Sequence, residues 1–249
     1  GETLTASCED RINTTGSPRV ASDSSRVTGS GTPTPTVTPV ITPTPAATVT
    51  PSTTFNIIQV SGGEHQAYFL NSDGTVWGCG KNNLGQLGDG TKVDRNKPVQ
   101  VSNLENITTL AVGWYSELAL ESDGTVWVWG RSSYGYLKFG NAKITTTPKK
   151  AKGLDDVIAL SSGKFYCLAL KSNGTVWGWG RNTYGQLGDT VTGYTKAPVK
   201  IKGIDNVTAI IAGRAYCMAL LSDGTVWTWG RNTYGQLGDG TTRNRNKPV

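Results

Sequence analysis

The chain has 249 residues, 36% of them apolar, and a formal net charge of +6 at pH 7. Its apolar runs fall well short of the roughly 18–20 residues that a membrane-spanning helix needs, so we expect no membrane span. Thirty-two glycines, eight tryptophans and the lack of a helical apolar period favour an all-β protein of short strands and tight turns.

Residues 1–54 are expected to form a disordered Ser/Thr/Pro-rich tail and linker. From residue 28 onward the tail is a run of Thr-Pro pairs, and proline fixes φ and removes a backbone donor. Stalks of this composition are typical of secreted or wall-associated proteins, which indicates an extracellular or cell-surface location. An ordinary disordered linker in the cytoplasm or nucleus is the alternative.

Four copies of one motif follow the tail at a spacing of 50 residues. The copies read Ser-Asp/Asn-Gly-Thr-Val-Trp and begin at Ser72, Ser122, Ser172 and Ser222. A fixed period of this size is typical of propellers, solenoids and arrays. The predicted repeats are 55–104, 105–154, 155–204 and 205–249, the last of them truncated.

Each repeat predicts four strands, and the second repeat shows the pattern. Its first strand is 106–111, and its second ends in Leu118-Ala-Leu. A two-residue Asp-Gly connection at Asp123 leads to the third strand, because both residues tolerate positive φ. The outer, fourth strand begins at Pro148.

The third strand is apolar on both faces. Trp127 and Trp129 are two residues apart and share one face, while Val126 and Val128 share the other. A small sheet with two apolar faces must be covered on both sides, and repeated four-stranded meanders achieve this by stacking around an axis. The pattern therefore predicts a β-propeller with about four blades and the tryptophans in its core.

The repeated sequence motif resembles that of a known family over residues 55–249. Gly-Thr-Val-Trp-x-Trp-Gly-Arg-Asn-Thr-Tyr-Gly-Gln-Leu-Gly-Asp-Gly, followed by Pro-Val, resembles the regulator of chromosome condensation repeat. The resemblance implies a propeller that closes with seven blades. The chain departs from the family's usual histidine at Gln66, Ser116, Tyr166 and Tyr216.

Just under four repeats would leave the first and last blades uncovered. Exposed strand edges and blade faces invite association. We therefore expect the chain to be a fragment that meets missing blades or associates with itself, with a closed four-bladed ring or a dimer of arcs as alternatives.

No catalytic constellation is found, so we expect neither an enzyme nor a cofactor. His65 is the only histidine, and no nucleophile stands at a recognisable elbow. Three loop aspartates lack the spacing of a calcium loop, so turn stabilisation is predicted for them and no metal: Asp89, Asp189 and Asp239. The repeat cysteines are predicted to be buried thiols rather than disulfides: Cys79, Cys167 and Cys217.

A candidate partner face lies in the connection after the first strand of each repeat. These triplets differ between copies and are rich in Trp, Tyr and Arg, which dominate binding hot spots. The candidate residues are Glu64, His65, Gln66, Trp114, Tyr115, Lys164, Phe165, Tyr166, Arg214 and Tyr216. The alternative is that these side chains cap the propeller core or line its channel.

A second candidate is a basic patch in the second repeat. It contains Arg131, Lys138, Lys143, Lys149, Lys150 and Lys152. Such a patch could attract nucleic acid, an anionic polymer or an acidic protein. Lysines on an outer strand also protect against edge-to-edge pairing, which is the alternative.

Three functions remain open from the sequence. The first is a non-enzymatic protein- or glycan-binding propeller, secreted or displayed on a surface. The second, implied by the resemblance, is a guanine-nucleotide exchange factor for a small GTPase, although no exchange residue can be matched here. The third is a secreted enzyme-inhibitor propeller. Fold alone does not decide among them.

Overall fold

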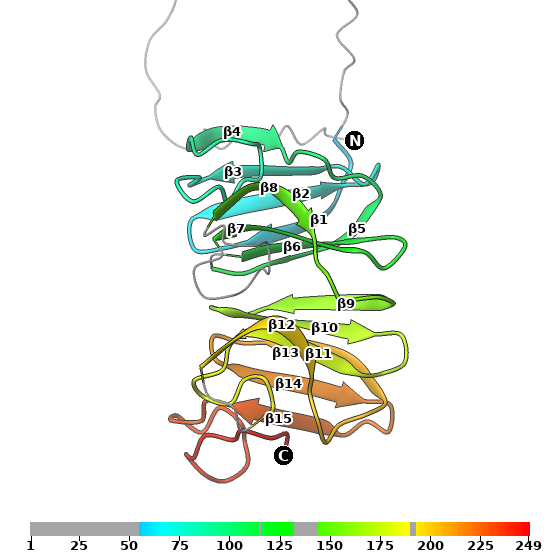
Figure 1. The fold of residues 1–249 in the computed structure, drawn as a ribbon, viewed down its shortest axis with the longest axis vertical. Coiled ribbons are helices and arrows are strands. Elements are labelled where there is room, and N and C mark those ends of the chain that lie inside the picture. Colours follow the sequence, from blue (N-terminus) through cyan, green and yellow to red (C-terminus); the bar gives the residue numbers. More distant parts are fainter. Residues whose placement is uncertain (1–54, 115, 132–143, 190–192) are drawn as a thin grey trace, which may run out of the picture. The chain divides into compact units, whose positions relative to one another are not determined.

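The computed structural model describes residues 55–114, 116–131, 144–189 and 193–249 (Figure 1). Within these ranges, fifteen strands form four antiparallel sheets and no helix occurs. In particular, none of these residues belongs to a helix long and apolar enough to cross a membrane. The predicted tail, 1–54, lies outside the described residues.

Each sheet is a meander whose strands pair in chain order. The first sheet contains β1 (Ile57–Gly62), β2 (Gln66–Asn71), β3 (Val76–Gly80) and β4 (Arg95–Gln100). The second contains β5 (Ile107–Val112), β6 (Ser116–Glu121), β7 (Val126–Arg131) and β8 (Ile144–Lys150). The third contains β9 (Val157–Ser162), β10 (Tyr166–Lys171), β11 (Val176–Arg181) and β12 (Tyr194–Lys200). The fourth contains β13 (Val207–Ala212), β14 (Tyr216–Leu221) and β15 (Val226–Gly230).

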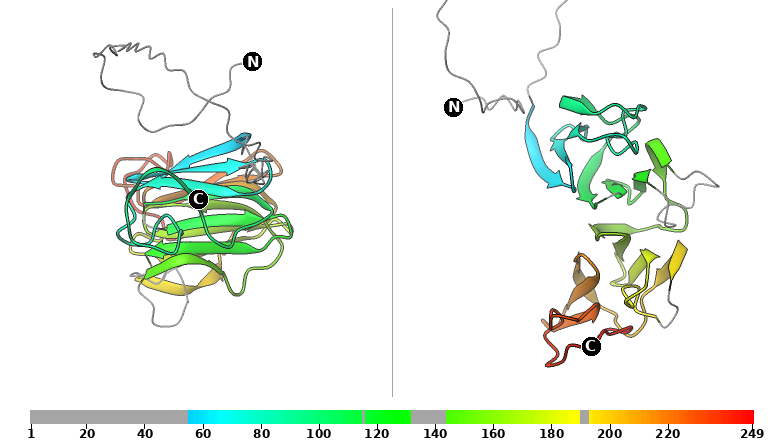
Figure 2. Two further views of the ribbon diagram at one scale, coloured as in Figure 1. Left: turned by 90° about the horizontal axis from the view of Figure 1, so that it is seen from above. Right: turned by 90° about the vertical axis from the view of Figure 1, so that its left-hand side faces the viewer.

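Successive sheets pack face to face in chain order (Figure 2). The inner strands make these contacts: β5 packs on β1 and β2, β9 on β5 and β6, and β13 on β9 and β10. The four-stranded meander repeated in this way is the blade of a β-propeller, so the predicted all-β propeller fold is confirmed.

The two apolar faces of the third strand enter different cores, as the alternation predicts. Trp129 of β7 is fully buried against Tyr68 and Leu87 of the first repeat. Val126 and Val128, on the opposite face, are buried in the core between the second and third sheets. One strand therefore joins two interfaces.

The first tryptophan of each pair is less buried than the sequence suggests. Trp127 is half-buried, and the Lys150 ammonium lies 5.1 Å from the centre of its ring. Trp77, in the repeat that has Cys79 at the second tryptophan position, is also half-buried and makes an edge contact with Phe55, with 4.9 Å between the ring centres. The prediction that the tryptophans lie in the core therefore holds for the second tryptophan of each pair. The first is half-buried at the edge of the core.

The Asp-Gly or Asn-Gly connection is longer than the predicted two-residue hairpin. Between β10 and β11 it spans four residues, and only Gly174 has positive φ, at 74°. A Cβ on Gly174 would lie 2.9 Å from the Asn206 Cα, so the turn must be glycine for the next sheet to approach. The Gly174 carbonyl accepts a hydrogen bond from the Val207 amide at 3.0 Å.

The outer strands begin earlier than their prolines suggest. Pro98 lies inside β4, an edge strand whose pairing with β3 is irregular between Gly78 and Gly80. In the fourth sheet, Val249 exchanges two hydrogen bonds with Thr228, but no fourth strand is formed among the described residues.

The face of the third sheet that is turned toward the fourth is covered, whereas the corresponding face of the fourth sheet is exposed. Leu170 and Val176 are fully buried against the following sheet. Their equivalents Leu220 and Val226 are 40% and 55% exposed. Apolar positions that form an interface in the third repeat thus face outward in the fourth.

Candidate binding face

The turn after the first strand and the end of the third strand meet at one end of each sheet. The Arg181 amide donates to the Phe165 carbonyl at 2.7 Å, and Arg231 repeats this bond to Ala215 at 2.8 Å. In the first repeat, Lys81 donates to His65 at 3.0 Å. In each of these three repeats, the bond places the basic residue after the third-strand motif beside the variable triplet. We call the surface formed by these turns and strand ends the loop face.

The loop that follows the third strand is held by buried amides. Asn182 Oδ1 accepts a hydrogen bond from the Leu187 amide at 2.8 Å. Gln186 Oε1 accepts one from the Tyr184 amide at 2.8 Å, and both amide side chains are buried. The main chain beneath Tyr184 is therefore fixed, and its ring is presented on the loop face.

This loop is also tied to the next sheet. The Gln186 carbonyl accepts a hydrogen bond from Trp229 Nε1 at 2.8 Å. The first and second repeats contain the same bond, from Trp129 to Gln86 at 2.6 Å. The core tryptophan of one sheet thus anchors the loop of the preceding sheet.

Trp114 stands at the centre of a group of cations. The Lys164 ammonium lies 3.8 Å from the centre of the indole ring, and the Arg214 guanidinium carbon lies 5.6 Å from it. Both distances allow cation–π attraction, worth about 0.5–1 kcal/mol at an exposed site. The triplets of three different repeats therefore meet at one aromatic ring.

The alternation of cations and rings continues across the third and fourth repeats. The Arg181 guanidinium lies 5.7 Å from the centre of the Phe165 ring and 5.7 Å from that of Tyr184. Arg231 follows, at 5.3 Å from Tyr184 and 5.5 Å from Tyr234. Together with Trp114, Lys164 and Arg214, these residues form what we call the cation–aromatic row.

The cations of this row are not neutralised by carboxylates in the part of the chain that the structure describes. By contrast, Arg95 and Arg245 pair with Asp89 and Asp239 at 2.8 and 2.6 Å. Hydrogen bonds from Thr91 and Arg95 outweigh the effect of burial and lower the pKa of Asp89. The carboxylates that form ion pairs with arginines thus lie in the loop turns, and none of them pairs with a cation of the row, which keeps its positive charge.

The predicted partner-face residues fall into two groups. Those that reach the surface are Glu64, His65 and Arg214, which are exposed, and Trp114, Lys164, Phe165 and Tyr216, which are half-buried. Gln66 and Tyr166 are buried instead, because their side chains turn between sheets. The Tyr166 hydroxyl donates to the Gly213 carbonyl at 3.0 Å. Tyr115 lies outside the described residues.

Gln66 contacts a buried carboxyl that the sequence analysis did not single out. Its Nε2 donates to Glu117 Oε1 at 3.0 Å. The other oxygen of Glu117 has no hydrogen-bond partner among the described residues. Burial raises the pKa of Glu117 well above its ordinary value, and the Gln66 hydrogen bond opposes this only in part.

The predicted basic patch is not one cluster. Arg131 pairs with Ile144 at one end of the β7–β8 ladder, whereas Lys150 pairs with Trp127 at the other. Four residues of strand separate the two ends by about 13 Å, at about 3.3 Å per residue. Lys149 and Lys152 are exposed near Lys150, and Lys138 and Lys143 lie outside the described residues.

Four members of the row escaped the sequence analysis because they belong to the repeated motif: Arg181, Arg231, Tyr184 and Tyr234. Repetition indicates scaffold, and the binding candidates in the sequence were the variable triplets and the basic patch of the second repeat. A usable signal was present, since the residue after Trp-x-Trp-Gly (Cys79-Gly in the first repeat) is basic in every copy: Lys81, Arg131, Arg181 and Arg231.

The remaining chemical groups have structural roles. Asp89 Oδ1 accepts a hydrogen bond from the Thr91 amide at 2.9 Å, so the predicted turn stabilisation is confirmed there. No group of three or more potential metal ligands occurs among the described residues. The three repeat cysteines are buried thiols not joined in disulfides, as predicted: Cys79, Cys167 and Cys217. Burial raises the pKa of Cys217, which keeps it protonated.

Comparison with solved structures finds propellers of similar fold. Human WBSCR16 is 26% identical with a TM-score of 0.71, over 78% of this chain and 52% of that one. Yeast RCC1 (Prp20) bound to Kap60 is 20% identical with a TM-score of 0.70, over 78% and 48%. A second structure of Prp20p from Saccharomyces cerevisiae is 22% identical with a TM-score of 0.68, over 78% and 50%.

The chain spans about half the length of these structures. No curated protein matches it at the level of sequence. The family model described as the RCC1-like domain matches residues 24–249, which is most of the chain. Together with the four stacked meanders and the motif that recurs in each, this match shows that the chain belongs to the RCC1-like domain family.

Proposed function

We propose that this chain is a non-enzymatic, protein-binding propeller module and that its loop face holds the partner. The observation that carries the proposal is the cation–aromatic row, in which Trp114 is contacted by cations from two other repeats. Tryptophan, tyrosine and arginine are the residue types that dominate binding hot spots.

The charge of the row indicates the kind of partner. Lys164, Arg181, Arg214 and Arg231 have no carboxylate partner among the described residues, so the face attracts acidic surfaces. An acidic protein is therefore the favoured partner, ahead of a neutral glycan. The Thr/Pro-rich composition of the tail is the observation in favour of a secreted or surface-displayed module.

A direct test compares capture of partner proteins by three forms of the chain. Trp114→Ala removes the central ring, and Lys196→Ala is a control on the exposed outer strand β12. Loss of a hot-spot ring weakens binding by about 2 kcal/mol or more, or roughly thirtyfold. We expect the capture of specific proteins to be lost in Trp114→Ala and kept in Lys196→Ala. Equal capture by both variants would contradict the proposal.

Exchange-factor activity on a small GTPase is the second candidate. Its support is the similarity to yeast RCC1 (Prp20), a protein whose binding to Gsp1p and histones has been studied. The measurement is nucleotide release from a panel of small GTPases in the presence of this chain. Release at the spontaneous rate throughout would leave the binding module as the only function proposed here.

A further inference from the structure

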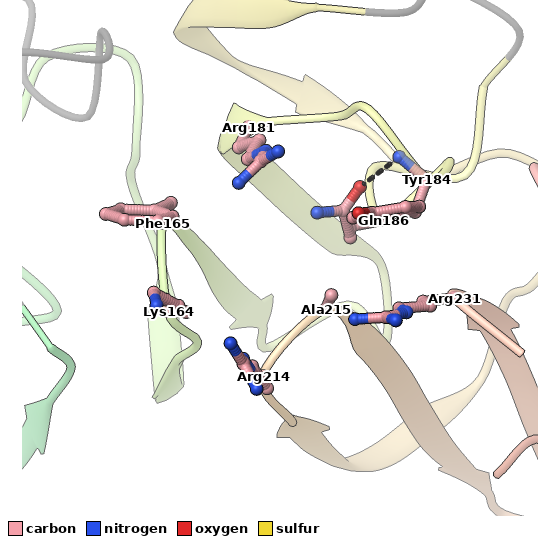
Figure 3. A pocket seen from close by; sticks show the side chains of 8 residues that line it. All are labelled: Lys164, Phe165, Arg181, Tyr184, Gln186, Arg214, Ala215 and Arg231. Carbon is pink, nitrogen blue, oxygen red and sulfur yellow. Dashed lines mark hydrogen bonds between the residues drawn. The ribbon is translucent and has the colours of Figure 1, made fainter. Parts of the chain in front are cut away.

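A small pocket lies in the loop face where the third and fourth sheets meet. Its volume is about 90 Å³. Its walls include Lys164, Phe165, Arg181, Tyr184, Arg214 and Arg231, which come from both sheets and surround one space (Figure 3). The volume is well below the about 300–1,000 Å³ of sites for drug-sized ligands. The pocket therefore suits one small chemical group rather than a whole organic ligand.

All four charged residues in the pocket wall are cations. They are held by aromatic rings: Lys164 and Arg181 lie 5.2 and 5.7 Å from the centre of the Phe165 ring. A ring orients a guanidinium without cancelling its charge, whereas a carboxylate would do both. The four cations consequently repel one another until an anion enters.

The arginine forks are also held in place from outside the pocket. Arg181 Nε donates to the Thr183 hydroxyl at 2.8 Å, and Arg231 Nε donates to the Thr233 hydroxyl at 2.9 Å. These bonds use only the Nε–H of each guanidinium, which leaves the terminal N–H groups available. Terminal N–H pairs are the donors that bind phosphate and carboxylate oxygens in bidentate geometry.

We propose that this pocket is a binding site for a phosphate monoester group, an anion of about two negative charges with three acceptor oxygens. Four cations exceed what a single carboxylate can satisfy, and a phosphate dianion matches them better in charge and in acceptors. The inference deepens the proposed function, because a phosphorylated side chain of the partner would place such a group on the loop face. Free phosphate shares the same chemistry.

The test uses inorganic phosphate, which needs no partner. Unfolding of the chain is followed with about 10 mM phosphate or with sodium chloride of equal ionic strength, since a ligand of the native state raises Tm. We expect a phosphate-specific rise at about pH 7.5 that falls at about pH 5.5, because inorganic phosphate takes up a proton and loses its second charge between these two pH values. Sulfate keeps its charge and should act equally at both.

Matched variants locate the effect. Arg181→Gln/Arg231→Gln should bind phosphate roughly tenfold or more weakly, because two charged hydrogen-bond donors are lost. Lys196→Gln removes the same kind of charge outside the pocket and should keep the rise. Arg214→Gln alone replaces the double variant if that variant unfolds in chloride. Absence of a phosphate-specific rise in the wild type, or an equal rise in the pocket variant, would overturn the proposal.

A short phosphoserine peptide and its unphosphorylated form distinguish the two sources of phosphate. Displacement of inorganic phosphate by the phosphopeptide alone supports a phosphorylated partner, and binding of inorganic phosphate alone supports the free anion. Phosphate binding by the wild type, together with partner capture that is unchanged in Trp114→Ala, would count against the proposed function only. The opposite result, capture with no phosphate binding in the wild type, would count against the pocket only.

Discussion

The interfaces between sheets and the loop face are built from the same repeats but from different kinds of position. At the interfaces, equivalent residues do the same thing in different repeats: Trp129 and Trp229 are both fully buried and both donate to the preceding loop. On the loop face, the equivalent residues Trp114, Lys164 and Arg214 differ and contact one another.

A repeat can therefore assign stability and recognition to different positions. Interface residues are selected by packing, which leaves little freedom at each position. Residues on a loop face contribute little to packing, so they are free to vary. The motif arginines belong to both groups, because their main chain fixes the loop while their side chains complete the face. Four substitutions test this division.

Trp129→Ala should have the largest effect, because it empties the core between the first and second sheets. Deleting a fully buried tryptophan costs about 3–5 kcal/mol, and at about 2–4 °C per kcal/mol Tm should fall by roughly 6–20 °C. Urea or thermal unfolding gives the value. A loss below about 1 kcal/mol would show that this interface does not hold the sheets together.

Gly174→Ala should have the next largest effect, and Gly224→Ala is its matched control. Both glycines have positive φ, but an added Cβ meets the Asn206 Cα at 2.9 Å only in the first case. We expect a cost of about 1–3 kcal/mol for Gly174→Ala and about 1 kcal/mol for Gly224→Ala. Equal losses of unfolding free energy would mean that approach of the next sheet does not require the glycine.

Glu117→Gln should stabilise the chain, and increasingly so as pH rises. Burial raises the folded-state pKa of Glu117, so the folded state holds the proton more tightly than the unfolded state. Wild-type stability is therefore lost as pH rises from the ordinary value of about 4.3 through the raised pKa.

The neutral glutamine carries no charge into the buried site, so it removes this loss and should gain about 1 kcal/mol or more at alkaline pH, which corresponds to a shift of about one pKa unit. The measurement is the difference in Tm between variant and wild type across pH, in which other titrations cancel. A difference that does not grow with pH would contradict a raised pKa at Glu117.

Arg231→Gln should have the smallest effect on folding. Its side chain lies on the loop face, and substitutions at such positions usually change stability by within about 0.5 kcal/mol. Circular dichroism and thermal unfolding would check this value. A loss as large as that of Gly174→Ala would place Arg231 in the scaffold and break the division between the two regions.

Much of the fold could be predicted from the sequence because period and alternation are strong signals. The 50-residue repeat and the two apolar faces around Trp129 predict stacked meanders, and the structure contains them. The hairpin turn was predicted too short, because the dipeptide pattern does not show that Asn206 packs against Gly174. That contact joins two repeats, and no local pattern contains it.

The candidate site was only partly predictable. The variable triplets indicated Trp114 and Arg214, but a sequence cannot show that Tyr166 turns inward while Phe165 remains at the surface. Arg181 and Tyr184 were missed because repetition alone does not separate packing from surface chemistry. Their joint placement beside Phe165 follows from the hydrogen bond between the Arg181 amide and the Phe165 carbonyl.

We expect the loop face to recognise a partner independently of the interfaces that hold the fold. Partner capture and Tm, measured together on Trp114→Ala, test it most directly. We predict that specific capture is lost while Tm stays within roughly 2–4 °C of the wild type. Capture at the wild-type level by a folded Trp114→Ala chain would show that the loop face does not recognise the partner through this ring.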